Sequence, residues 1–275
     1  GMPAPMLARF REILGRSTGM VLVTGPTGSG KTTTLYAALS EVNTNELKII
    51  TAEDPVEYRL AGITQVQVNE KIDLTFARVL RSILRQDPDV VLVGEMRDPE
   101  TAEIGLRAAI TGHLVLSTLH TRDAMSTPFR LLDMGIPPFM VSTSLQAVIS
   151  QRLVRLNCKE CAITHDPTPQ QQAWLTAMGV PLNSFTPMRS IGCTACNGTG
   201  YAGRQGVYEL LEMDAALTQA ASRVEPAVFM RMARERMKGR MLADHALELV
   251  LRGQTSLAEA LRVGFDAGDS DPLIP

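Results

Sequence analysis

The residues from Gly25 to Thr32 have the types and the spacing that bind the phosphates of a nucleotide. They read Gly-Pro-Thr-Gly-Ser-Gly-Lys-Thr and match the glycine-rich pattern G-x-x-x-x-G-K-[ST] in full. An apolar run at 20–24 precedes them and a helical pattern at 33–39 follows, so the loop joins a predicted strand to a predicted helix. Glycines let backbone N–H groups point inward at a helix start, which makes a concave anion site. The pattern therefore predicts a bound triphosphate.

Individual residues of this loop have expected roles. Lys31 is expected to reach the β- and γ-phosphates, and the hydroxyl of Thr32 is the expected ligand of Mg²⁺. A glycine-rich turn that arose by chance is the alternative, and the flanking strand and helix argue against it. The predicted phosphate-binding residues are Gly25, Pro26, Thr27, Gly28, Ser29, Gly30, Lys31, Thr32 and Thr33.

Acidic residues follow two further predicted strands. Glu53 comes after the run 47–52, and Glu95 follows 90–93. Because open parallel sheets bind ligands at the carboxyl ends of their strands, Glu53 is a candidate general base for the water that attacks the γ-phosphate. The alternative is a solvated turn started by Asp54-Pro55. Gly94 stands where a Walker B strand usually ends in Asp, so we expect Glu95 to contact Mg²⁺ through water.

Two further side chains are candidates at the same edge. His120 lies at the carboxyl end of the predicted strand 111–121, from where it is expected to hydrogen-bond the terminal phosphate. The alternative is a structural histidine, as expected for His113 at the other end. Arg97 either pairs with a neighbouring acid or reaches a phosphate, and the sequence leaves both open.

Three arginines fall on one face of a helix predicted over 73–86. They are Arg78, Arg81 and Arg85, at spacings of three and four. A solvated basic face is the default interpretation. The alternative is an arginine that stabilises transition-state charge, within the subunit or in a neighbour.

Two C-x-x-C pairs offer four sulfur ligands. Cys158 pairs with Cys161 and Cys193 with Cys196, and 31 residues separate the pairs. Such pairs fit a tetrahedral Zn²⁺ site, although the spacer exceeds that of the commonest zinc ribbons. Free thiols and disulfides are the alternatives, and the absence of a signal peptide favours metal over disulfides. No histidine accompanies the cysteines, so we expect a structural ion rather than a catalytic one.

Alternating strand-like and helix-like runs must position these groups, and they indicate an α/β fold. A short amphipathic helix is expected at 6–14 and a strand at 203–211. Further helices are predicted over 145–156, around Trp174, at 226–241, at 244–251 and after the capping-box pattern that starts at Ser256.

Composition limits the classes of function. The chain has 275 residues, with 27 Lys and Arg against 29 Asp and Glu, so no basic excess favours a nucleic-acid partner. No apolar run approaches the roughly 20 residues that span a membrane, and the order of a secretory signal is missing. We therefore expect a cytoplasmic protein. Gly1 before Met2 is typical of a residue left by a cleaved tag, so we expect a piece of a longer protein.

Together these motifs resemble those of the secretion ATPase superfamily. The resemblance rests on the phosphate loop, 52–58, 86–89 with 93–98, 111–113 with 118–121, and the paired cysteines. In that family the first four features are called the Walker A motif, the Asp box, the Walker B motif and the His box. Within that family, the tetracysteine lobe makes the chain similar to the type II secretion and type IV pilus assembly branch. The retraction motors resemble the core but lack this lobe.

The resemblance implies a RecA-like P-loop core that hydrolyses ATP with Mg²⁺ in a ring, usually a hexamer, whose active sites lie between subunits. It supports Glu53 as the acid that activates water, Glu95 near the metal and His120 as a γ-phosphate contact. The expected domains are a nucleotide-binding core at 1–156, a zinc-binding insert at 157–200, a mainly helical C-terminal subdomain at 201–263 and a flexible tail at 264–275.

The expected function is that of a motor ATPase that drives assembly of a pilus or pseudopilus. Its expected partners are platform and adaptor proteins at the cytoplasmic face of the inner membrane, which it reaches only through those partners. Family members usually carry an N-terminal domain that covers the nucleotide and supplies arginines. Without that domain, this chain is expected to bind nucleotide, hydrolyse it weakly and remain monomeric.

Two other classes are alternatives. One is a hexameric nucleic-acid translocase on the same core, which a basic pore lining would favour. The other is a non-catalytic, nucleotide-gated interaction module, and the intact Lys31, Thr32 and Glu53 argue against it.

Overall fold

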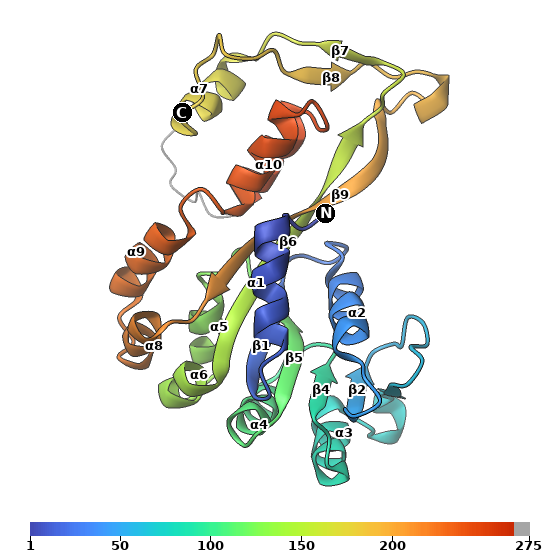
Figure 1. Cartoon of the computed structure of the whole chain (residues 1–275), viewed down its shortest axis with the longest axis vertical. Helices are drawn as coiled ribbons and strands as arrows, with labels where there is room; N and C mark the ends of the chain where they lie inside the picture. The colour runs from blue at the N-terminus through green and yellow to red at the C-terminus, as the bar shows by residue number, and fades with distance from the viewer. Residues whose placement is uncertain (267–275) are drawn as a thin grey trace. The chain divides into compact units, whose positions relative to one another are not determined.

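The computed structural model describes residues 1–266 (Figure 1). They form two compact units. The core unit comprises 3–150 and 210–237, and the second unit comprises 1–2, 151–209 and the described residues from 238 on. Strands β6 (Leu145–Asn157) and β9 (Tyr201–Glu212) each contribute residues to both units.

A parallel sheet forms the centre of the core unit. The strand order is β3-β2-β4-β5-β1-β6-β9, and the described pairings among β1 to β6 are all parallel. Four of these strands, β1, β2, β4 and β5, are buried along their whole length, as apolar runs covered on both faces should be. The α/β prediction is confirmed. The bounds are β1 Gly19–Thr24, β2 Ile49–Glu53, β3 Thr64–Gln67, β4 Val90–Val93 and β5 Leu114–Leu119.

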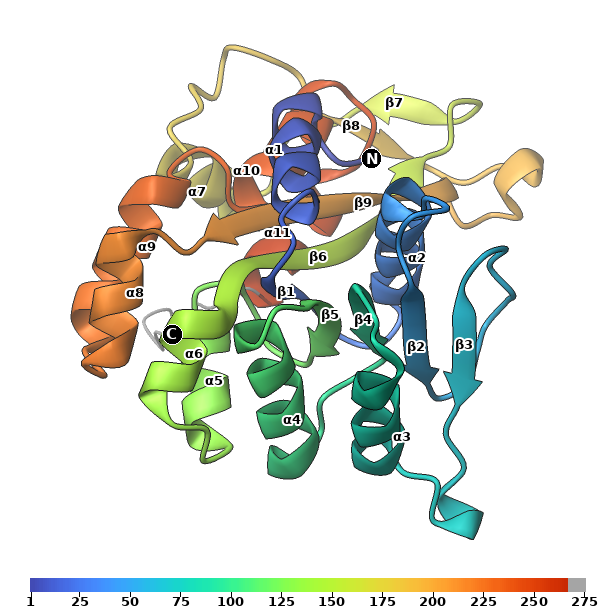
Figure 2. The ribbon, with the colours of Figure 1, turned by 60° about the horizontal axis from the view of Figure 1, so that its bottom comes forward.

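Helices cover both faces of this sheet. Helix α2 (Lys31–Val42) joins β1 to β2, whereas α3 (Phe76–Ile83), α4 (Pro99–Ile110) and α6 (Pro138–Ser144) lead into strands in the opposite direction along the sheet. Because such crossovers are right-handed, α2 lies on one face and the other three lie side by side on the opposite face (Figure 2). The remaining helices of the core unit are α1 Ala4–Leu14, α5 Thr127–Asp133, α8 Ala215–Ser222 and α9 Pro226–Met237.

The prediction of a helix over 145–156 is wrong, because this segment is strand β6. Ala147, Val148 and Ile149 pair with residues of β1. Their run is buried on both faces, so it shows no polar alternation that would separate a strand from a buried helix. Pairing with the free edge of β1 sets the conformation of this segment, and its local sequence does not.

The helix predicted over 73–86 is confirmed in a shorter form. Helix α3 begins after Thr75, whose hydroxyl accepts the N–H of Arg78. Asp73 has a φ of 58°, outside the helical region. A 3₁₀ turn, Leu84–Gln86, continues α3 to the predicted end. A second 3₁₀ turn, Glu70–Ile72, precedes it.

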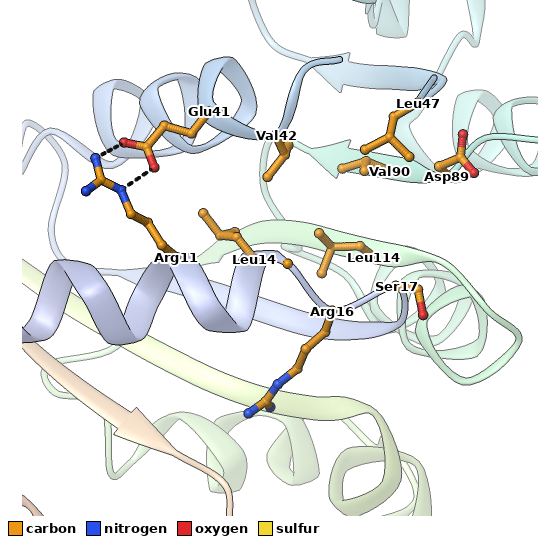
Figure 3. A pocket seen from close by; sticks show the side chains of 11 residues that line it. Arg11, Leu14, Arg16, Ser17, Glu41, Val42, Leu47, Asp89, Val90 and Leu114 are labelled. Atoms are coloured by element: carbon orange, nitrogen blue, oxygen red, sulfur yellow. Dashed lines mark hydrogen bonds and ion pairs between the residues drawn. The ribbon is translucent and has the colours of Figure 1, made fainter. Parts of the chain in front are cut away.

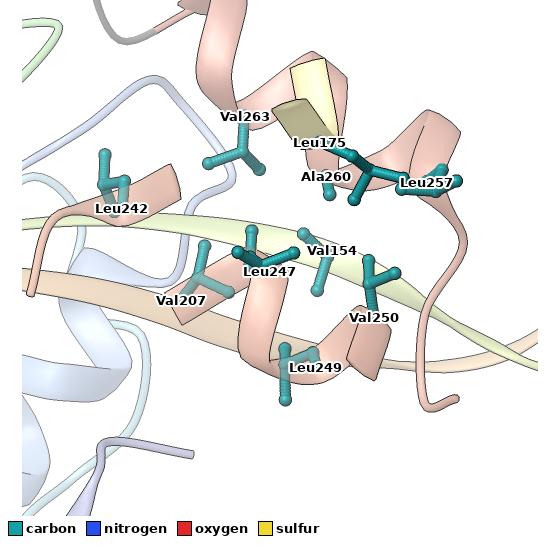
Figure 4. Close-up of a cluster of buried hydrophobic side chains, with 11 residues drawn as sticks. Val154, Leu175, Val207, Leu242, Leu247, Leu249, Val250, Leu257, Ala260 and Val263 are labelled. Atoms are coloured by element: carbon teal, nitrogen blue, oxygen red, sulfur yellow. The ribbon is translucent and has the colours of Figure 1, made fainter. Parts of the chain in front are cut away.

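A hydrophobic core holds the second unit together (Figure 4). It gathers apolar residues of β6, β9, α7 (Pro169–Ala177), α10 (Leu242–Leu251) and α11 (Leu257–Asp266). Trp174 of the predicted helix α7 packs against this cluster. The remaining elements are an antiparallel pair, β7 Ala162–Thr164 with β8 Met188–Ser190, and a 3₁₀ turn, Thr194–Cys196.

The end of the described chain bears on one prediction. Helix α11 continues to Asp266, and beyond it the tail predicted over 264–275 lies outside the described residues. Among the described helices, none combines the length and the apolar composition that a membrane crossing requires.

Candidate functional site

The phosphate loop lies where β1 ends and α2 begins. Gly28 and Gly30 have φ values of 78° and 88°, which residues with a Cβ rarely adopt. Gly30 directly precedes Lys31, the first residue of a 12-residue helix. Unpaired N–H groups and the helix dipole attract anions at such a start. The loop therefore has the local geometry that its spacing predicts.

Lys31 and the two threonines after it occupy the first turn of α2. The Lys31 Nζ donates to the carbonyl oxygens of Gly25 at 2.9 Å and Pro26 at 3.1 Å, so its ammonium group is held against the loop. Thr32 and Thr33 are exposed. The Thr32 hydroxyl, proposed for Mg²⁺, therefore lies at the surface beside the loop.

The other predicted residues follow the carboxyl ends of neighbouring strands. Glu53 is the last residue of β2, Glu95 comes shortly after β4, and His120 directly follows β5. In the sheet these strands lie next to one another in the order β2-β4-β5-β1 and run parallel. Their carboxyl ends therefore meet at one edge, which is also the edge that bears the phosphate loop.

Glu53 is buried, with an exposed fraction of 3%. The hydroxyl of Tyr36 in α2 donates to its Oε2, and the hydroxyl of Thr51 in β2 donates to its Oε1. The amide Nε2 of Gln65 in β3 donates to the same Oε1 at 3.1 Å. Glu53 is therefore not the solvated turn residue of the alternative interpretation.

Gly94 follows β4 at the position where an Asp is usual, and a close backbone contact there favours glycine. Its N–H donates to the carbonyl oxygen of Ala52 at 2.7 Å, which draws the end of β4 against β2. A Cβ at this position would lie 3.2 Å from that oxygen and 3.4 Å from the Cα of Glu53. A side chain here would push against the backbone that carries Glu53, so glycine keeps the two strand ends together.

Glu95, Arg97 and His120 form a small charged group at the strand ends. The Nε of Arg97 donates to Oε1 of Glu95 at 2.6 Å, and Nε2 of His120 lies 3.9 Å from Oε2 of Glu95. Of the two options open for Arg97, pairing with a neighbouring acid is the one present here. The Glu95 side chain is mostly buried, while those of its two partners are largely exposed.

The arginines of α3 and the turn after it form a solvated face. Arg78 pairs with Asp73 and Arg81 with Glu100, and the side chains in both pairs are at least half exposed. Arg85 donates to the carbonyl oxygen of Arg81 at 3.1 Å. This arrangement agrees with the default interpretation of a solvated basic face.

The four cysteines meet as the spacing predicts. Their sulfur atoms all lie within 4.8 Å of one another. The distances from Cys158 to Cys193 and from Cys161 to Cys196 are both 3.9 Å, and Cys193 lies 3.8 Å from Cys196. Sulfurs at ~2.3 Å from a tetrahedral zinc ion are ~3.8 Å apart, so the donor set fits that ion. All four cysteines are free, which excludes the disulfide alternative in this structure.

Backbone donors favour a thiolate at Cys196. The N–H groups of Cys193 and Gly200 each lie 3.2 Å from the sulfur of Cys196. Chiefly through the first of these hydrogen bonds, they lower the pKa of the Cys196 thiol to about 6. Metal-bound cysteine is a thiolate, so these two backbone hydrogen bonds suit the sulfur of Cys196 to metal binding.

Sequence reasoning missed Tyr36 and Gln65, the described residues of other elements that donate hydrogen bonds to the carboxylate of Glu53. Tyr36 is four residues after Thr32 in α2, a spacing that places both on one helix face. This spacing from Thr32 could have indicated that the Tyr36 side chain lies on the helix face that carries the phosphate-loop residues. Gln65 lies in the short strand β3, which has no apolar run to indicate it.

A cavity of about 490 Å³ lies at the opposite edge of the sheet (Figure 3). Val90 and Leu114, the first residues of β4 and β5, line it. Arg11 and Glu41 close one side through two hydrogen bonds of 2.8 and 2.7 Å. Because the strands are parallel, these amino ends face away from the phosphate loop, and the cavity is not the nucleotide site.

The fold and the strand-end geometry define the class of P-loop nucleotide-binding α/β proteins. Residues 1–262 match the model of one family within that class, described as Type II/IV secretion system protein. The chain belongs to this family.

Individual relatives are similar over about half of their own length. The Type II secretion system protein E of Aeromonas hydrophila is 49% identical over 260 residues, which cover 92% of this chain and 50% of that protein. The Type IV pilus assembly ATPase PilB of Myxococcus xanthus is 48% identical over 279 residues, covering 98% and 47%. The crystal structure of the pilus retraction motor PilT with bound ADP has a TM-score of 0.70 and 31% identity, covering 99% of this chain and 66% of that one.

Proposed function

We propose that this chain is the ATP-hydrolysing domain of a motor protein for type II secretion or type IV pilus assembly. The observation that carries the proposal is the meeting of the phosphate loop with Glu53, Glu95 and His120 at one edge of the sheet. The relatives add support, since one of them is described as a type II secretion system protein and another as a type IV pilus assembly ATPase.

The residues have separate roles in this proposal. The loop from Gly25 to Thr33 binds the phosphates, with Lys31 on the β- and γ-phosphates and the Thr32 hydroxyl as a ligand of Mg²⁺. Mg²⁺ would neutralise charge on the phosphates, and Glu95 is the residue that would hold it through water. Glu53 accepts a proton from the attacking water.

Arg97 and His120 complete the proposed site. Both have largely exposed side chains beside Glu95, from which they can turn to a terminal phosphate. His120 donates a hydrogen bond to the γ-phosphate, and Arg97 exchanges its pairing with Glu95 for a phosphate oxygen.

We further propose that Cys158, Cys161, Cys193 and Cys196 hold a structural Zn²⁺. The sulfur spacing supports this ion, and four protein ligands leave no open position for a substrate. The ion would fix the segment 157–200, a proposed zinc-binding lobe between the nucleotide-binding core at 1–156 and the mainly helical subdomain at 201–263.

At the level of the whole protein, we propose a homo-hexameric ring with active sites between subunits. Family membership supports this assembly. Its proposed partners are platform and adaptor proteins at the cytoplasmic face of the inner membrane, and only they connect it to the membrane. Nucleic acid is not among the proposed partners, in keeping with the net charge of −2.

Phosphate release from ATP tests the proposal. Glu53→Gln keeps the shape of the side chain but removes the proton acceptor, so it should bind Mg·ATP normally and release phosphate at least about 100-fold more slowly. Lys31→Ala should lose nucleotide binding itself. Glu70→Gln, an exposed acid in a 3₁₀ turn, is the matched control and should keep the wild-type rate.

Two results would contradict parts of this proposal. Wild-type turnover by Glu53→Gln would disprove the assignment of the base. Strong stimulation of phosphate release by single-stranded DNA would favour a nucleic-acid translocase over a secretion or pilus motor.

A further inference from the structure

The carboxylate of Glu53 is held by neutral groups from three elements. Tyr36 of α2 donates to Oε2, while Thr51 of β2 and Gln65 of β3 donate to Oε1. A carboxylate with an exposed fraction of 3% is costly to ionise unless hydrogen bonds replace its lost water. These donors stabilise the ionised form that a general base requires.

The two oxygens of this carboxylate differ in what they can still accept. A carboxylate offers about two acceptor sites on each oxygen. Among the described residues, Oε1 already accepts from Thr51 and Gln65, whereas Oε2 accepts only from Tyr36. Oε2 is therefore the oxygen that retains an acceptor site for a water molecule, and the hydroxyl of Tyr36 orients this oxygen.

The hydroxyl of Tyr36 is itself fixed in place. The backbone N–H of Glu57 and the amide of Gln65 both donate to its oxygen at 3.3 Å. The ring of Tyr58 packs edge-on against its ring, with centroids 4.7 Å apart. Because these groups donate to the oxygen, the phenolic hydrogen is directed to Glu53.

Tyr36 keeps its proton at neutral pH. Burial, followed by the hydrogen bond to Glu53, raises the pKa of Tyr36 to about 12. The carboxylate of Glu57, in the loop after β2, also raises it. Glu53 and Glu57 are the charged groups that raise the pKa of Tyr36, and the side chains of Gln65 and Tyr58 also contact it.

Tyr36 also belongs to the helix that carries the phosphate-loop residues. It follows Thr32 by four residues, so the two side chains lie one turn apart on the same face of α2. We propose that Tyr36 is a positioning residue that ties Oε2 of Glu53 to the helix bearing Lys31 and Thr32, and that Oε2 is the atom that accepts the proton of the attacking water. This inference rests on the proposed role of Glu53 as general base.

The step balances as follows. An O–H bond of the attacking water breaks and its proton passes to Oε2 of Glu53. The water oxygen forms a bond to the γ-phosphorus, and the bond from that phosphorus to the β–γ bridging oxygen breaks, leaving ADP and phosphate. Tyr36 donates its hydrogen bond throughout and gives up no proton.

Tyr36→Phe tests the inference, because it removes one hydroxyl and keeps the ring. The hydroxyl donates to Oε2 of Glu53, so its loss removes one of the hydrogen bonds that replace water on this buried carboxylate. The acid limb of the pH profile of kcat should move to higher pH by roughly half to one unit, and kcat at neutral pH should fall about 10-fold. The KM for ATP should stay within about twofold, because Tyr36 acts through Glu53.

The matched control is Tyr58→Phe. Tyr58 touches Tyr36 through its ring, and its hydroxyl takes part in no hydrogen bond within the described chain. This variant should keep the wild-type profile. If Tyr36→Phe does not fold, Thr51→Val removes another donor to Glu53 at nearly constant shape and should move the acid limb in the same direction.

Comparison with Glu53→Gln separates the two proposals. If Glu53→Gln is slow and Tyr36→Phe has an unshifted acid limb, the positioning role is overturned while the base assignment stands. If Glu53→Gln turns over at the wild-type rate, the base assignment fails and the inference fails with it. A shift in Tyr36→Phe but not in Tyr58→Phe, with a slow Glu53→Gln, supports both.

Discussion

Two buried carboxylates in this chain have partners of opposite kinds. Glu53 is 3% exposed and accepts from neutral donors, whereas Glu259 is 2% exposed and accepts from the guanidinium groups of Arg155 and Arg262. A carboxylate with neutral donors can take up a proton without leaving an unpaired cation, and Glu259 cannot. The hydrogen-bond partners of Glu53 therefore suit it to proton transfer, whereas those of Glu259 suit it to stabilising the fold.

Glu259→Gln tests the structural role within the second unit. It removes the charge that pairs with Arg155 at 2.8 Å, so at pH 7 we expect the free energy of unfolding to fall by about 2 kcal/mol. Urea unfolding followed by circular dichroism measures this change. Glu248→Gln, which removes an exposed partner of Arg252, is the control and should cost less than about 0.5 kcal/mol.

The cost of Glu259→Gln should depend on pH. Burial alone raises the pKa of Glu259, but hydrogen bonds from Arg155 and the charge of Arg262 hold it below the usual value near 4.5. A lowered folded-state pKa means that the stabilisation is complete above the unfolded-state value and disappears as pH falls through the folded-state value. The difference between wild type and variant should therefore shrink below about pH 4.5. An equal difference at pH 7 and at pH 3 would contradict the ion-pair account.

At the scale of elements, the two cysteine turns depend on each other. Each turn contributes two sulfurs, and the 3.9 Å distances join one turn to the other across 35 positions in the sequence. Short elements surround them, such as the three-residue strands β7 and β8. Such elements bury little apolar area, so a metal ion would supply much of their stability.

Cys161→Ser tests this dependence. Wild-type protein should carry about one zinc ion per chain, and the variant should lose it, because three sulfurs hold the ion far less tightly. Proteolysis should then cut within 157–200 first. Elemental analysis and mass spectrometry of the fragments measure both effects. Thr194→Ser, a change inside the second turn that spares the sulfurs, should retain the metal, and wild-type protein without zinc would contradict the proposal.

At the scale of the whole molecule, the proposed ring makes activity depend on assembly. The described edge offers the phosphate loop, Glu53, Glu95, Arg97 and His120, while Arg78 and Arg81 are paired with acids on an exposed face. If a neighbouring subunit completes the site, phosphate release per chain must follow the fraction of assembled chains.

We therefore expect the rate per chain to be weak while the chain is a monomer and to rise with the assembled fraction when chain concentration is varied over about 100-fold. Sedimentation velocity at the same concentrations measures the assembled fraction, and Lys31→Ala serves as the inactive reference. A rate per chain that stays constant while the assembled fraction rises would contradict a site shared between subunits, as would full turnover by protein that sediments as a single chain.

Features set by short stretches of sequence were predictable. Lys31 and Thr32 follow Gly30 directly, so the loop and the helix start form a unit whose geometry depends on a few adjacent residues. Buried strands such as β1 and β4 are recognisable in the sequence as apolar runs between turns. The two C-x-x-C pairs likewise indicate a metal site, because such pairs in a chain without a signal peptide suggest metal more than disulfides.

The sequence by itself thus determined the class of fold, the phosphate loop and the candidate ligands. Only the tertiary structure decided that 145–157 is a strand, because its backbone pairs with the free edge of β1. It also decided that Tyr36 and Gln65 hold Glu53, because helix α2 and strand β3 each bring a donor to the end of β2. Such contacts join residues that no local sequence pattern relates. They are what places the proposed base, Glu53, at the edge of the sheet that carries the phosphate loop.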